Sequence, residues 1–222
     1  MARLTRRIVA IGGAGLDEPA LTAYLLSRSR GRRVCFLPTA SGDSDEYIKA
    51  FYVAFRGADA THLELFQRTE QDLRGYLGAQ DLIYVGGGNT ANLLAIWRVH
   101  GVDAILREAY AGGTLLCGSS AGCICWFECG ITDSFGLGLA PLRDGLGILS
   151  GSACPHYDAE ERRRPVYTAA VRAGLPPGIA LDDPVAARYD DERLAEIVSA
   201  RPGGRAYRVT ADGEDALELR VL

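Results

Sequence analysis

The chain of 222 residues is 48% hydrophobic and 23% charged, with a formal net charge of −4 at pH 7. This length and composition predict one domain, residues 1–222, with a full hydrophobic core. The negative charge leaves no basic stripe for nucleic acid, and no apolar run is long enough to cross a membrane. The basic N-terminus leads into a short strand-like run without a cleavage site, so we expect no secretory signal and a cytoplasmic protein.

The first half of the chain alternates between strand and helix patterns. The predicted strands are residues 7–13, 33–37, 61–66, 81–85 and 114–117. The predicted helices are residues 18–30, 45–56, 69–77, 91–99 and 101–111. This alternation predicts an α/β fold with a mostly parallel, doubly wound sheet that carries helices on both faces.

The pattern changes after residue 122. Residues 123–129 are apolar enough for a buried helix, 130–151 are glycine-rich and loop-like, and 160–173 form a charged helix. The predicted short strands are residues 152–155, 179–181, 185–189, 194–198, 207–209 and 216–221. We expect the strands after residue 178 to form an antiparallel C-terminal extension of the same sheet.

A pentapeptide, Gly118-Ser119-Ser120-Ala121-Gly122, directly follows the predicted strand 114–117. A G-x-S-x-G sequence between a strand and an apolar stretch is typical of a nucleophile elbow, a strained turn that presents the serine hydroxyl. The two flanking glycines leave room for the backbone to fold back on itself. The pattern therefore predicts Ser120 as a nucleophile.

Serine needs a base to remove its proton, and histidine is the usual base near neutral pH. The chain offers three histidines. His62 belongs to a polar strand face, and His100 lies at a helix end, where histidine commonly interacts with the last carbonyls. His156 follows the predicted strand 152–155, and ligand sites in open α/β sheets form beyond the carboxyl ends of the strands. His156 is therefore the predicted base.

A buried carboxylate normally holds the imidazole in the required tautomer. Asp133 is the first candidate, because it is the only ionisable residue between residues 130 and 142. The alternatives are Glu128, Asp158, Asp182 and Asp183.

A glycine loop, Gly86-Gly87-Gly88-Asn89-Thr90, follows the predicted strand 81–85. In a parallel sheet this loop can meet the serine turn, so that the backbone N–H groups of Gly88 and Ala121 stabilise a tetrahedral oxyanion. The rival interpretation is a phosphate-binding loop, but the P-loop lysine is missing and the G-x-G-x-x-G spacing does not fit.

Six cysteines include a C-x-C-x3-C run at residues 123–129, which is not a zinc spacing. We interpret the cysteines as buried small hydrophobes in a reducing compartment and expect neither a metal nor another cofactor. A redox role for Cys117 or Cys123 is the alternative.

Four motifs in this order, residues 86–90, 118–122, 132–134 and 155–157, resemble the peptidase E family, S51. This family contains the aspartyl dipeptidases and is related to cyanophycinase. The resemblance implies a class I glutamine-amidotransferase-like, flavodoxin-like fold with serine in place of the elbow cysteine. It also implies Ser120 as nucleophile, His156 as base, Asp133 as third member, and Gly88 and Ala121 as oxyanion hole. Members of the family are cytoplasmic and independent of metals.

Aspartyl dipeptidases of this family recognise the N-terminal aspartate through an arginine downstream of the histidine. Three arginines are candidates here, Arg163 first and then Arg162 and Arg164, since a guanidinium suits a carboxylate. The alternative is a solvated helix face paired with neighbouring glutamates. Asn89 is a further candidate for contact with substrate.

The resemblance implies a serine exopeptidase that releases the N-terminal residue, with aspartate as candidate, from dipeptides or short peptides. A monomer or a homodimer is expected. The alternatives on the same site are a cyanophycinase-like β-aspartyl peptidase and a broader aminopeptidase. An esterase of the α/β-hydrolase type is disfavoured, because that fold places its histidine near the end of the chain. A binding module without catalysis is the non-enzymatic alternative.

Overall fold

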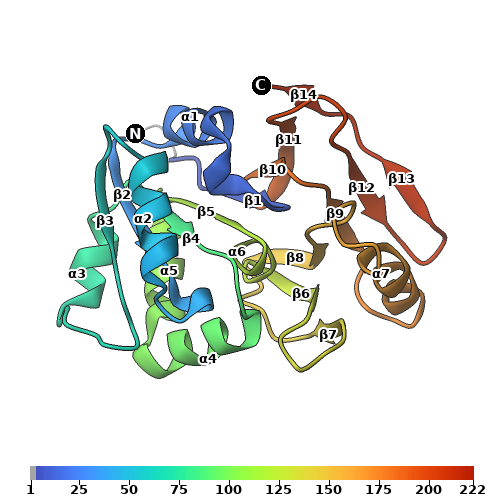
Figure 1. Ribbon diagram of the computed structural model, residues 1–222, viewed down its shortest axis with the longest axis horizontal. Helices are drawn as coiled ribbons and strands as arrows, with labels where there is room; N and C mark the ends of the chain where they lie inside the picture. Colours follow the sequence, from blue (N-terminus) through green and yellow to red (C-terminus); the bar gives the residue numbers. More distant parts are fainter. Residues whose placement is uncertain (1–3) are drawn as a thin grey trace.

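The structure, a computed structural model, describes residues 4–222 and forms two β-sheets within that range (Figure 1). The eight-stranded sheet has the order β14-β11-β10-β1-β5-β4-β2-β3. Its strands are β1 (Arg7–Ile11), β2 (Arg33–Leu37), β3 (Asp59–His62), β4 (Leu82–Val85), β5 (Leu115–Ser119), β10 (Val185–Asp190), β11 (Arg193–Ser199) and β14 (Arg220–Val221). Strands β1 to β5 pair in parallel, whereas β10 joins β1, and β11 joins β10, in antiparallel pairs.

The six-stranded sheet has the order β13-β12-β9-β8-β6-β7 and lies beside the first sheet (Figure 1). Its strands are β6 (Phe127–Thr132), β7 (Ala140–Leu142), β8 (Leu149–Cys154), β9 (Gly178–Leu181), β12 (Ala206–Val209) and β13 (Glu214–Ala216). Its central pairs β6–β8 and β8–β9 are parallel, and its outer pairs are antiparallel.

Helices cover both faces of the eight-stranded sheet. The α-helices are α1 (Pro19–Arg28), α2 (Asp45–Ala54), α3 (Leu73–Gly78), α4 (Thr90–His100), α5 (Val102–Ala111), α6 (Ala121–Ile124) and α7 (Arg163–Arg172), with 3₁₀ turns η1 (Gly15–Asp17) and η2 (Thr39–Ser41). Within residues 4–222 no helix is both long and apolar enough to cross a membrane.

Strand β1 shows how the two faces are filled. Ile8 and Ala10 belong to the hydrophobic cluster that includes residues of α3, α4 and α5, whereas Val9 and Ile11 belong to the cluster with α1 and α2. A strand buried on both faces must be apolar wherever it is covered, which explains the unbroken hydrophobic run after Arg7, from Ile8 to Ile11. The helix-covered, mostly parallel sheet confirms the predicted α/β fold class.

Three details expected of the second half of the chain differ in the structure, although the antiparallel extension itself is present as β10 and β11. Residues 123–129 are not one helix, because α6 ends at Ile124 and β6 begins at Phe127, and the "loop" 130–151 contains the rest of β6 and all of β7. The C-terminal strands do not all extend one sheet. Strands β10, β11 and β14 extend the first sheet, while β9, β12 and β13 complete the second, whose own core packs against α7.

The parallel strands bring several loops to one edge of the first sheet. Strands β1, β2, β4 and β5 all end at this edge, so the chain segments that follow them meet there. The carboxyl edge of a parallel sheet is where α/β proteins form their ligand sites. The candidate site lies at this edge.

Candidate active site

Ser120 sits in a strained turn between β5 and α6. Its backbone has φ 57° and ψ −113°, which a non-glycine residue rarely adopts. The turn is held by the Ser120 N–H, which donates to the carbonyl of Ile11 at 3.2 Å, and by the Ser120 carbonyl, which accepts from Cys123 N–H at 2.9 Å. The strand–turn–helix geometry is that of a nucleophile elbow.

The flanking glycines are required by close backbone packing. A Cβ at Gly122 would lie 2.3 Å from the carbonyl oxygen of Val85, and one at Gly118 would lie 2.7 Å from the same oxygen. The elbow can therefore press against the end of β4 only because both positions lack a side chain.

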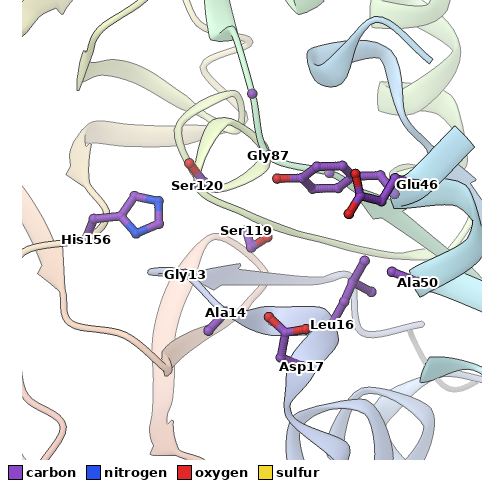
Figure 2. A pocket seen from close by; sticks show the side chains of 14 residues that line it. Gly13, Ala14, Leu16, Asp17, Glu46, Ala50, Gly87, Ser119, Ser120 and His156 are labelled. Atoms are coloured by element: carbon purple, nitrogen blue, oxygen red, sulfur yellow. The ribbon is translucent and has the colours of Figure 1, made fainter. Parts of the chain in front are cut away.

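A pocket of about 340 Å³ opens beside Ser120 (Figure 2). Four segments that follow β1, β2, β4 and β5 contribute to it, together with His156 from beyond β8. Its lining residues are Gly13, Ala14, Gly15, Leu16, Asp17, Glu46, Tyr47, Ala50, Gly86, Gly87, Gly88, Ser119, Ser120 and His156. The predicted nucleophile and base thus line one cavity.

His156 points its imidazole toward Ser120 (Figure 2). Its Nδ1 lies 3.0 Å from Oδ2 of Asp183, in the connection between β9 and β10. A neutral imidazole that donates from Nδ1 keeps Nε2 free to accept a proton. The arrangement can therefore work as a base held by a carboxylate.

The Asp183 carboxylate is held in place by its surroundings. Its backbone N–H donates to Oδ1 of Asp158 at 2.9 Å. A Cβ at Gly13 would lie 2.2 Å from Asp183 Oδ1, so glycine at that position makes room for the carboxylate. The neighbouring Asp182 turns away and accepts from the backbone N–H of Arg205 at 3.0 Å. Burial, with the like charge of Asp158, raises the pKa of Asp182 to about 6.

The glycine loop after β4 packs against the elbow. A Cβ at Gly87 would lie 3.3 Å from the Ser120 Cβ, and Gly88 has φ 133°, which favours glycine. The following residue donates its N–H to the carbonyl of Ala40 at 2.8 Å and so fixes the loop. Within residues 4–222 the N–H groups of Gly87 and Gly88 donate no hydrogen bond, which leaves them available to a ligand.

Ser119 also faces the pocket, at its floor (Figure 2). The hydroxyl of Tyr84 donates to Ser119 Oγ at 3.2 Å. Burial raises the pKa of Tyr84, so this phenol stays protonated and remains a donor. The hydroxyl of Ser119 therefore already has a hydrogen-bond partner.

The chain is similar to known peptidases. The model of peptidase family S51 matches residues 8–197. The chain belongs to peptidase family S51. The uncharacterized peptidase YgaJ of Bacillus subtilis strain 168 is 46% identical over 96% of both chains. The uncharacterized peptidase Lmo0363 of Listeria monocytogenes is 31% identical over 64% of this chain and 74% of its own length.

Two solved structures share the fold of this S51 peptidase. One is a peptidase from an acI-B1 actinobacterium, with a TM-score of 0.72 and 14% identity over 98% of this chain and 96% of the other. The second is described as a peptidase E protein from Listeria monocytogenes EGD-e, with a TM-score of 0.61 and 19% identity over 97% and 99%. At these identities the likeness concerns the fold alone.

The structure does not bring Asp133 to His156 in this S51 peptidase. Asp133 is exposed in the loop after β6 and lines a separate hollow together with Leu137 and Arg162. The carboxylate that reaches the imidazole belongs to Asp183, which was only one of the alternatives from sequence. Strands β6 and β9 both flank β8 in parallel, so both carboxyl ends lie beside that of β8, but the loop after β6 turns away into β7 while the segment after β9 carries Asp183 to the imidazole.

The three candidate arginines lie outside the pocket. Arg163 is only 3% exposed and donates to Glu160 and to the Ile131 carbonyl, both at 2.8 Å. Arg164 bonds to Glu214 and lies over two tyrosine rings, and Arg162 lines the separate hollow. None of the three therefore lines this pocket, and Arg163 and Arg164 already have structural partners.

Asn89 also has a structural role. Its Oδ1 accepts from Asn92 N–H at 2.8 Å and so caps the N-terminus of α4, and its Nδ2 donates to the Ser134 carbonyl at 3.2 Å. Asn89 does not line the pocket, and its polar atoms are occupied by these contacts.

All six cysteines are buried free thiols. Burial raises their pKa, to about 12 for Cys35 and Cys154, so the reactive thiolate is disfavoured. This supports their interpretation as small core residues. Within residues 4–222 no group of three or more His, Cys, Asp or Glu side chains could hold a metal ion.

Sequence reasoning missed two acidic residues of the pocket, Asp17 and Glu46. Both come from segments that follow central parallel strands, β1 and β2. This position is the signal that could have found them, because such segments form the ligand site in α/β folds.

Proposed function

We propose that this S51 peptidase is a serine exopeptidase that releases the N-terminal residue of dipeptides or short peptides. The observation that carries the proposal is that the strained Ser120 and the carboxylate-held His156 share one pocket. The modest volume of the pocket, about 340 Å³, is near the lower end for small-molecule sites and favours a short peptide over a protein chain.

In the proposed reaction, Ser120 Oγ attacks the scissile carbonyl while His156 Nε2 takes the hydroxyl proton. Asp183 stabilises the imidazolium and keeps Nδ1 protonated. The backbone N–H groups of Gly88 and Ala121 are the proposed donors to the oxyanion, and each such donor is typically worth about 3–4 kcal/mol.

The tetrahedral intermediate then collapses. The C–N bond breaks, His156 returns its proton to the leaving amine, and the acyl group stays on Ser120 as an ester. Water, deprotonated by the same imidazole, hydrolyses the ester and releases the N-terminal amino acid.

The proposed specificity does not include a preference for N-terminal aspartate. Arg163 and Arg164 have other contacts, Arg162 lines a separate hollow, and two carboxylates line the pocket instead. A cyanophycinase-like β-aspartyl activity is the second candidate, and the substrate β-Asp-Arg in the panel below tests it.

The test combines active-site labelling with kinetics. Incubation with a fluorophosphonate, followed by peptide mass mapping, should place the label on Ser120 and not on Ser119. Hydrolysis of a panel of X-Leu dipeptides, with β-Asp-Arg and a short-chain ester as further arms, should show peptide cleavage that Ser120→Ala abolishes. Ester cleavage without any peptide cleavage, or peptide cleavage by Ser120→Ala at the wild-type rate, would refute the proposal.

A further inference from the structure

The pocket has two chemically different ends. Ser120 and His156 occupy one end, while Asp17 and Glu46 project their carboxylates into the other (Figure 2). Asp17 ends the 3₁₀ turn η1 after β1, and Glu46 lies in the first turn of α2 after β2. The two carboxylates thus come from separate segments that converge on one cavity.

Neither carboxylate has a structural partner. Within residues 4–222, the side-chain carboxylates of Asp17 and Glu46 form no hydrogen bond and no ion pair, and the N–H of Asp17 donates only to the backbone carbonyl of Ala14. Their acidic neighbours differ, since Glu18 pairs with Arg201, and Asp43 accepts from the N–H groups of Leu65 and Phe66. No contact among the described residues therefore explains why carboxylates stand at positions 17 and 46, which face the pocket.

In the described part of the chain, no lysine or arginine lines the pocket beside these two carboxylates. The remaining members of the lining are glycines, small or apolar residues, hydroxyl groups and His156. Two carboxylates in one concave site favour a cation and disfavour an anion there, through a field that water weakens because both side chains are exposed.

We propose that the Asp17–Glu46 end of the pocket receives a cationic group of the substrate, an ammonium or a guanidinium. The inference deepens the proposed function and rests on it. Two sources supply this chemistry: the free α-amino group of the peptide, and the side chain of an N-terminal lysine or arginine. In either case Asp17 and Glu46 determine which peptides are cleaved, and an acidic N-terminal side chain is disfavoured.

The first experiment compares matched dipeptides on the wild-type enzyme. Lys-Leu is set against norleucine-Leu, which has nearly the same shape without the charge, and Arg-Leu against citrulline-Leu. Each peptide is also used with an acetylated N-terminus. A tenfold or larger advantage in kcat/KM for the charged side chain assigns the site to that side chain. A tenfold or larger advantage in kcat/KM for the free over the acetylated form of every peptide assigns the site to the α-ammonium group.

The second experiment asks whether the two carboxylates cause the preference. Asp17→Asn, Glu46→Gln and the double variant should each reduce the advantage, and the double variant should bring it to within about twofold of unity. Asp45→Asn is the matched control, because Asp45 neighbours Glu46 on α2 but does not line the pocket. All three residues are exposed, so the variants should fold.

Binding separates this inference from the proposed function. Isothermal titration of the same peptides into Ser120→Ala protein reports the cation preference without catalysis. If no peptide is cleaved but the charged peptides bind more tightly in a manner that depends on Asp17 and Glu46, the proposed function fails and the cation site stands. Equal binding of charged and uncharged peptides, a preference for Asp-Leu, or a preference unchanged in the double variant would overturn the inference.

Discussion

Nδ1 of His156 lies 3.0 Å from Oδ2 of Asp183, and the backbone N–H of Asp183 donates to Asp158 at 2.9 Å. This chain of contacts connects the second sheet to the first, because His156 follows β8 and Asp183 lies between β9 and β10. The proposed base at the edge of one sheet is therefore oriented by a connection between both sheets. The positions of His156 and Ser120 consequently depend on how the two sheets pack.

Replacing the carboxylate should identify the third catalytic group. In Asp183→Asn we expect kcat to fall by about 10³–10⁴, because the amide favours the wrong imidazole tautomer and cannot stabilise the imidazolium. Asp133→Asn is the control and should keep activity within about twofold, since Asp133 lies in a separate hollow. Steady-state kinetics with one dipeptide substrate measures kcat for both variants. The opposite order of effects would mean that Asp133 reaches the imidazole during turnover.

The arginines after His156 should affect stability rather than specificity. In Arg163→Ala the carbonyl of Ile131 loses its charged donor in a buried position, so we expect a loss of about 2–3 kcal/mol in the free energy of unfolding. Arg162→Ala, at an exposed position, should change it by less than about 0.5 kcal/mol.

The same variants also test substrate recognition. The ratio of kcat/KM for Asp-Leu to that for Ala-Leu should stay within about twofold of wild type in Arg162→Ala, Arg163→Ala and Arg164→Ala. A selective loss of Asp-Leu cleavage in one of them would restore that arginine as a contact for an acidic substrate.

The local motifs of the sequence predicted much of the first sheet. Strands β1, β2, β4 and β5 are short apolar runs bounded by turn residues, and the helical patterns between them favoured a parallel sheet buried on both faces. The segment 123–129 was misread for a physical reason, because a short apolar run fits a buried helix and a buried strand equally well. The segment becomes a strand because β6 pairs with β8, which begins only at Leu149.

The site was predictable to the same extent. Ser120 and His156 follow from the elbow pattern and from a position at the end of a strand, which are local signals. Asp183 lies 27 residues after His156, and only the packing of β9 beside β8 shows that it, rather than Asp133, meets the imidazole. Asp17 and Glu46 share a pocket because of the backbone conformation of the segments after β1 and β2. The residue types in these segments do not determine that conformation by themselves.

The elbow glycines should tolerate no side chain. Gly122→Ala would place a Cβ 2.3 Å from the Val85 carbonyl oxygen, a backbone atom that cannot move aside cheaply. We expect a loss of about 2–3 kcal/mol in the free energy of unfolding, together with reduced activity, as the turn that carries Ser120 shifts.

Gly78→Ala is the control for this substitution. Gly78 lies in α3, and a Cβ there meets nothing within 4 Å. Alanine is the better helix former, so this variant should gain up to about 0.5 kcal/mol and keep its activity. Urea denaturation of both variants measures the difference. Similar stabilities for the two variants would show that the elbow relaxes around the added methyl group.

An ion-pair cluster far from the site should give the protein a distinct acid sensitivity. The buried Asp81, at the start of β4, accepts hydrogen bonds from the guanidinium and backbone N–H of Arg33, and its carboxylate also pairs with Arg30 at 3.1 Å. The guanidinium of Arg33 is the main reason that the pKa of Asp81 falls to about 2. A carboxyl group with a depressed folded-state pKa stabilises the protein above its unfolded pKa of about 4, and this contribution is lost as the pH falls toward 2.

Asp81→Asn should therefore lower the free energy of unfolding at pH 7 by about 1–2 kcal/mol, a range that allows for solvent screening of the half-exposed Arg33. The difference from wild type should shrink steadily between pH 5 and pH 2, as wild-type Asp81 also becomes neutral. Urea denaturation across this range measures it, with Asp212→Asn as control, since Asp212 is exposed and forms no hydrogen bond or ion pair within residues 4–222. A difference that stays constant with pH would mean that Asp81 acts through packing, because only its ionised form attracts the two arginines.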